Sequence, residues 1–197
     1  MTGIASCNIA LGGPIENGRD QTGAFNPSSW VHLYAIWGTG KPTSPFDTIF
    51  SASSMAPTLP AGYTHWAYIL PIFLDSLTHL SGIRVFGNKA SYAPSRAVLT
   101  NGTATVETQI ASTSYVPPNA RSWTIGINNH PVSGVVRTCA IRVLSATAYI
   151  TLPVAGGSVD PGGYFSQLVI PNLGLYYQFT SGAGLLDITA LGYEFEN

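Results

Sequence analysis

The chain has 197 residues, of which 45% are hydrophobic and only 9% are charged, and its formal net charge is -1. This length can bury a substantial core, and the hydrophobic content excludes a disordered chain. The longest apolar stretch, 66–74, is about half of the roughly 20 residues that a spanning helix needs, and the chain lacks a basic stripe, so we expect neither membrane insertion nor a nucleic-acid partner.

Turn-forming sequences divide the chain into short β-like runs. Pairs such as Asn17-Gly18 and Asn101-Gly102, and the sequence Asp-Pro-Gly-Gly at 160–163, favour tight turns. We predict roughly ten to twelve strands. The clearest runs, in chain order, are 30–37, 63–70, 84–86, 104–111, 122–127, 135–144, 148–152, 165–170, 176–180 and 185–190. The best helical candidate, 71–80, fits a strand followed by a turn equally well.

Many short strands without crossover helices must pair antiparallel, and at this length the compact solution is two packed sheets. The sequence therefore predicts an all-β fold with little or no helix. We expect an antiparallel β-sandwich, of which the jelly roll is one form. The predicted domain is 1–197, and the alternative is that halves of about 1–100 and 101–197 form separate sheets or subdomains.

Catalytic and metal-binding patterns are not found in the sequence. The four histidines form neither a His-Glu-x-x-His motif nor a His-x-His pair, so we predict no metal and no cofactor. Glycoside hydrolysis needs two facing carboxyl groups. Of nine carboxylates, only Asp47, Glu107 and Asp187 lie in or beside predicted strands. We therefore predict no catalytic residue and no enzymatic activity.

The two cysteines, Cys7 and Cys139, are too few for a disulfide framework. Residues 1–10 lack a basic region followed by an apolar core, which a secretion signal would have. We expect folding in a cytoplasm and two reduced thiols.

Ligand binding requires an exposed surface rather than a motif. Aromatic residues make up 11% of the chain, and aromatic rings stack on the apolar faces of sugars. Packing in the core or in an interface is the alternative role for each of them. The candidate ligand-binding residues, all next to turn sequences, are Trp37, Tyr63, Tyr92, Tyr115 and Tyr164.

Three segments together resemble a known group of proteins. They are Trp-Val-His-Leu-Tyr at 30–34, Ser-Ala-Ser-Ser-Met-Ala-Pro-Thr-Leu-Pro-Ala-Gly-Tyr-Thr at 51–64, and Tyr-Val-Pro-Pro-Asn-Ala-Arg at 115–121. In this order they resemble the C-terminal β-rich domains of bacteriophage and prophage tail-fibre and related virion proteins. The match covers roughly 17–127, and 56–64 is its most specific part. Such proteins often continue with a basic pair and a polar strand, whereas this chain has apolar residues at 66–71, which suggests a surface buried against another subunit or protein.

The resemblance implies a role in the virion. We expect a non-catalytic phage tail protein, from a fibre or baseplate, that folds in the host cytoplasm and binds a receptor during host attachment. Its expected partners are other tail proteins, a host cell-surface glycan or protein, and further copies of itself in a homotrimer, the number three resting on the resemblance. The alternatives are a glycan depolymerase of a tail spike and a free carbohydrate-binding module.

Overall fold

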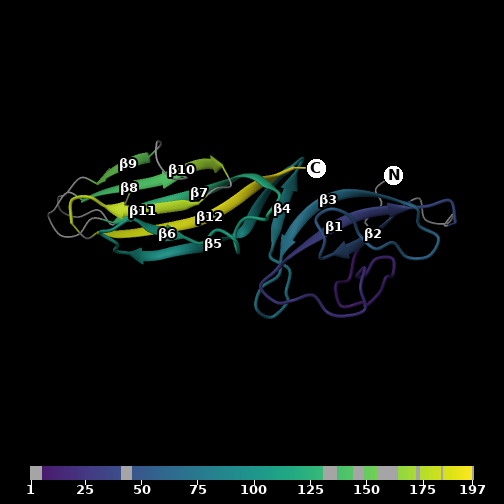
Figure 1. Cartoon of the computed structure of the whole chain (residues 1–197). Coiled ribbons are helices and arrows are strands. Elements are labelled where there is room, and N and C mark those ends of the chain that lie inside the picture. The colour runs from purple at the N-terminus through teal and green to yellow at the C-terminus, as the bar shows by residue number, and fades with distance from the viewer. Residues whose placement is uncertain are drawn as a thin grey trace. The chain divides into compact units, whose positions relative to one another are not determined.

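The computed structural model describes residues 6–40, 46–130, 137–143, 149–154, 164–171, 174–182 and 184–196. These residues form antiparallel sheets and no helix, which confirms the predicted all-β fold (Figure 1). None of the described segments could therefore cross a membrane as a helix. The chain divides into two compact units, Met1–Ser81 and Gly82–Glu196, which we call unit 1 and unit 2.

Unit 1 contains one three-stranded sheet in the order β2-β1-β3. Its strands are β1 (Trp30–Trp37), β2 (Asp47–Ser51) and β3 (His65–Phe73), and both pairings are antiparallel. The central strand β1 is apolar on both of its alternating faces, as expected of a strand that is covered on both sides. Residues 18–20 extend the β2 edge, where Arg19 forms an isolated parallel bridge with Phe50.

The segment 51–64, which carries the most specific resemblance, connects β2 to β3 and packs onto the sheet. Tyr34 is fully buried, and its hydroxyl donates to the Ser53 carbonyl at 2.8 Å. The Thr58 backbone N–H donates to Asp20 Oδ2 at 3.1 Å. These two contacts tie the connection to β1 and to the N-terminal segment, so its role within unit 1 is structural.

Unit 2 contains two antiparallel sheets, in the orders β10-β7-β12-β5-β4 and β6-β11-β8-β9. The sheets pack as a β-sandwich (Figure 1). The Tyr177 hydroxyl of the second sheet accepts a hydrogen bond from the Ala104 N–H, beyond the end of β5, at 3.4 Å. The strands are β4 (Ile83–Phe86), β5 (Lys89–Gly102), β6 (Thr108–Ile110), β7 (Ala120–His130), β8 (Arg137–Val143), β9 (Tyr149–Val154), β10 (Tyr164–Pro171), β11 (Leu175–Phe179) and β12 (Leu185–Phe195).

The division of the chain differs from the expected halves. Residue 100 lies inside β5, which pairs with both β4 and β12, so the compact units divide after Ser81 instead. The sequence 71–80 is a strand end followed by a turn, because β3 runs to Phe73 and residues 75–79 turn back. The strand-and-turn alternative for this segment is therefore confirmed.

Candidate ligand-binding site

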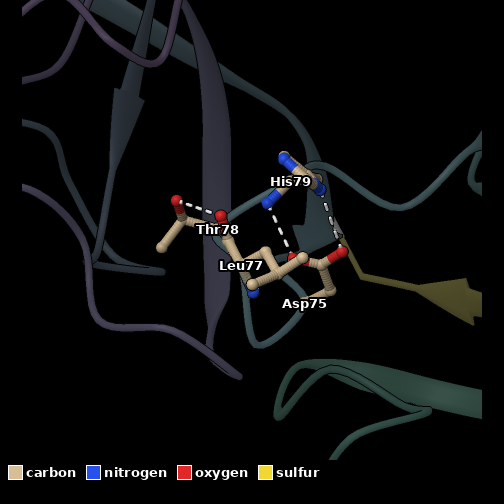
Figure 2. A network of polar contacts seen from close by, with 4 residues as sticks. All are labelled: Asp75, Leu77, Thr78 and His79. Carbon is tan, nitrogen blue, oxygen red and sulfur yellow. Dashed lines mark hydrogen bonds and ion pairs between the residues drawn. The ribbon is translucent and has the colours of Figure 1, made fainter.

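A tight turn at 75–79 follows β3 and is held together by one carboxylate (Figure 2). Asp75 Oδ1 accepts the backbone N–H groups of Leu77 and His79, each at 2.8 Å, and Asp75 Oδ2 lies 3.3 Å from His79 Nδ1. The pKa of Asp75 is lowered, mainly by the N–H of His79. Thr78 has a φ of 62°, in the left-handed region. The turn leaves the Leu77 side chain 70% exposed.

The N-terminal segment, residues 6–25, places Arg19 close to this turn. The Asp20 N–H donates to the Phe50 carbonyl at 2.8 Å, and the Phe50 N–H donates to the Gly18 carbonyl at 2.9 Å, which fixes the backbone on both sides of Arg19. Arg19 Nη2 donates to the Thr22 carbonyl at 3.0 Å. Among the described residues Arg19 has no carboxylate partner, and its Nε is buried without an acceptor.

A cleft of about 420 Å³ lies between the N-terminal segment and the turn. Its volume falls within the range of small-ligand sites, which combine apolar walls with a few polar groups. Here Arg19, Thr78 and His79 contribute the polar side chains. Its lining residues include Ile9, Arg19, Phe25, Leu74, Leu77 and His79.

Among the predicted ligand-binding residues whose exposure the structure describes, Trp37 is the most exposed, at 38%. It ends β1, and its ring stacks on that of His65, which opens β3, with centroids 5.7 Å apart and an interplanar angle of 10°. This pair lies at the opposite end of β1 and β3 from the cleft, because Leu74 follows the last residue of β3. Trp37 and the cleft are therefore separate features of unit 1.

Tyr63 is a core residue, which corrects its prediction as a ligand contact. It is buried in the cluster of Tyr34, Ile36 and Ile49, and its hydroxyl donates to Asp47 Oδ2. Burial is the main cause that raises the pKa of Tyr63, and the Asp47 carboxylate raises it further. Its ring face is therefore unavailable to a ligand.

Tyr92 is also buried, because it packs within unit 2 instead of lining a loop. Its hydroxyl donates to the Tyr115 carbonyl at 2.8 Å, and burial raises the pKa of Tyr92 to about 12. The Arg96 guanidinium lies 5.3 Å from the Tyr92 ring centroid and 5.0 Å from that of half-buried Tyr115. Tyr92 and Tyr115 thus form a structural cation–π cluster. The last candidate, Tyr164, opens β10, and its side chain lies outside the described part of the structure.

The three carboxylates expected in or beside strands accept structural hydrogen bonds. Asp47 belongs to unit 1, whereas Glu107 and Asp187 belong to unit 2. Their partners are Asn17 and Tyr63 for Asp47, Arg142 for Glu107, and Asn101 and His130 for Asp187. The described residues contain no cluster of three His, Cys, Asp or Glu side chains that could hold a metal ion.

The sequence prediction did not identify the cleft residues. The pattern Asp-x-Leu-x-His at 75–79 carries a usable signal, since an Asp that caps a turn leaves an apolar Leu77 without a place in a strand. Arg19 gave no such signal, because its approach to the turn depends on pairing between segments about thirty residues apart, a separation typical of sheet contacts. Comparison of the chain with protein-family models, curated proteins and solved structures gives no match.

Proposed function

We propose that this chain is a non-catalytic bacteriophage tail protein that attaches to a bacterial surface saccharide through the cleft of unit 1. The observation that carries the proposal is the cleft itself, an open cavity lined by apolar side chains and by the polar side chains of Arg19, Thr78 and His79. The resemblance of 51–64 to tail-fibre domains supplies the virion context. In unit 1 this segment supports the same sheet that ends at the cleft.

A binding role without catalysis agrees with the carboxylates of the described residues. A glycosidase needs two carboxyl groups about 5–10 Å apart around a substrate. Asp47 is engaged by Tyr63, and Asp187 is engaged by His130 and by the Asn101 N–H. Both carboxylates therefore accept hydrogen bonds from groups within the fold.

The proposal includes assembly as a homotrimer with further copies of the chain. β3 forms one edge of the unit 1 sheet, and its first three residues are exposed, including Trp66. β4 forms one edge of a unit 2 sheet and ends in Phe86, which is 91% exposed. Edge strands with exposed apolar side chains are suited to burial against another subunit. Threefold symmetry is taken from the resemblance to fibre proteins.

A microarray of purified bacterial surface polysaccharides tests the attachment role. The fluorescently labelled chain should bind at least one polysaccharide, and Leu77→Ser should weaken that binding because it removes an apolar contact from the cleft. Met55→Ser is the matched control, since Met55 is 80% exposed on the β2–β3 connection and does not line the cleft.

Reducing ends released from every bound polysaccharide should stay at the level of a protein-free sample. Failure to bind any polysaccharide would reject the attachment role. Equal loss of binding in both leucine and methionine variants would reject the cleft as its site. Steady release of reducing ends, abolished by Asp47→Asn or Asp187→Asn, would replace the proposal with a depolymerase.

A further inference from the structure

The cleft of unit 1 contains a cation whose charge is not balanced by a neighbouring carboxylate. Arg19 lines the cleft and uses Nη2 to hold the Thr22 carbonyl, while its Nη1 makes no hydrogen bond to the described residues. The nearest carboxylate of the turn, Asp75, is already occupied by two backbone N–H groups and by His79. Arg19 is therefore the charged group of the cleft that still has donor capacity.

From this arrangement we infer that the cleft binds a sugar unit that carries a carboxylate, such as a hexuronate, in the surface polysaccharide. The Nη1 group of the permanently charged Arg19 guanidinium forms a stronger hydrogen bond with a carboxylate than with a neutral hydroxyl. Hydrogen bonds to charged groups are also stronger than those between neutral groups. The class of the sugar thus follows from the charge of Arg19, and the inference rests on the proposed attachment function.

The remaining walls of the cleft suit the other parts of such a sugar. The exposed Leu77 side chain supplies apolar surface for the C–H groups of a pyranose ring. His79 directs Nδ1 at Asp75, which leaves Nε2 for a sugar hydroxyl. A carboxylate therefore pairs with Arg19 while the ring lies along Leu77.

The test is a set of NMR titrations of the full chain with two matched trisaccharide pairs. The charged probes are trimers of galacturonate and of glucuronate, and the neutral probes are the same trimers after reduction of each carboxylate to a hydroxymethyl group. A charged trimer should bind at least about tenfold more tightly than its reduced partner, because the charge-assisted bond is lost. Its binding should shift the amide resonances of 75–79.

Variants of cleft residues separate the effect of charge on binding from any effect on folding. Arg19→Gln should weaken uronate binding about tenfold or more, with little effect on the reduced trimer. Because Arg19 also bonds to the Thr22 carbonyl, a second pair avoids that structural contact: relative to Leu77→Ser, Leu77→Asp should weaken uronate binding and Leu77→Lys should strengthen it. Met55→Asp, outside the cleft, should bind like the unchanged protein.

The outcomes distinguish this inference from the attachment function. Equal affinity for charged and reduced trimers would overturn the acidic-sugar class, as would binding of neither charged trimer. In both cases, binding of the chain to an arrayed polysaccharide through the cleft would leave the attachment function standing. Binding that follows charge but ignores all three cleft substitutions would place an acidic-sugar site elsewhere and overturn the inference.

Discussion

His32 should make the stability of unit 1 depend on pH between about 7 and 5. Its side chain is 3% exposed, and Nδ1 lies 2.9 Å from the Tyr68 hydroxyl. Burial lowers the pKa of His32 from 6.5 to about 4, because the charged imidazolium would lose its hydration. In the unfolded chain the imidazole therefore takes up a proton at a higher pH than in the folded chain. Stability is complete above pH 6.5 and falls as the pH drops toward 4.

The size of this effect follows from the two pKa values. Between pH 7.5 and pH 5 the unfolded state gains nearly one proton that the folded state does not, which lowers the free energy of unfolding by about 2 kcal/mol. The carboxylates with lowered pKa values, Asp75 and Asp187, titrate below this window and contribute little to it. The loss should therefore belong mainly to His32.

Urea unfolding followed by tryptophan fluorescence measures the effect. Three of the four tryptophans belong to unit 1, so the signal reports mostly on that unit. The unfolding free energy of the unchanged protein should fall by about 2 kcal/mol from pH 7.5 to pH 5, whereas His32→Gln should show a nearly flat profile. His65→Gln is the control, because His65 is exposed on the same sheet and should leave the slope unchanged. The same slope in His32→Gln as in the unchanged protein would refute the reasoning.

Three further results are expected. Gly38→Ala should lower the stability of unit 1 by about 1–3 kcal/mol, because a Cβ at Gly38 would lie 2.2 Å from the Gly62 carbonyl oxygen; an unchanged urea midpoint would contradict this. Iodoacetamide at neutral pH should modify half-buried Cys7 before Cys139, whose pKa burial raises to about 11, and the denatured mass should be that of a chain with two free thiols. Light scattering after size exclusion should report about three times the chain mass at micromolar protein, and a stable monomer would contradict subunit burial.

The sequence predicts best those strands that are covered on both faces, because most of their residues are apolar or β-forming. β1 was predicted because its aromatic and β-branched residues serve both faces of a central strand. β5 was missed because Pro94 and its neighbouring serines resemble a loop. In the structure Pro94 lies beyond the part of β5 that pairs with β4 and next to an irregular stretch of pairing with β12, which are positions where a strand accepts proline.

The candidate site was harder to predict than the fold because it depends on long-range contacts. Tyr63 follows a glycine turn and has the local context of an exposed residue, yet its hydroxyl reaches Asp47 and draws the ring into the core. Arg19 and Leu77 face one cleft although 57 intervening residues separate them in the sequence. Local patterns predict which residues turn or extend, but the partners across a sheet decide which of them remain exposed.

Hydrogen exchange of the whole chain, free and bound to a polysaccharide selected on the array, tests the proposed site most directly. If the cleft binds the saccharide, exchange should slow in peptides that cover 9–25 and 74–80, which contribute its two walls. Peptides that cover β4 and the start of β5 should exchange as in the free chain, since they belong to unit 2. Protection confined to unit 2, or to the Trp37 and His65 end of the unit 1 sheet, would contradict attachment through the cleft.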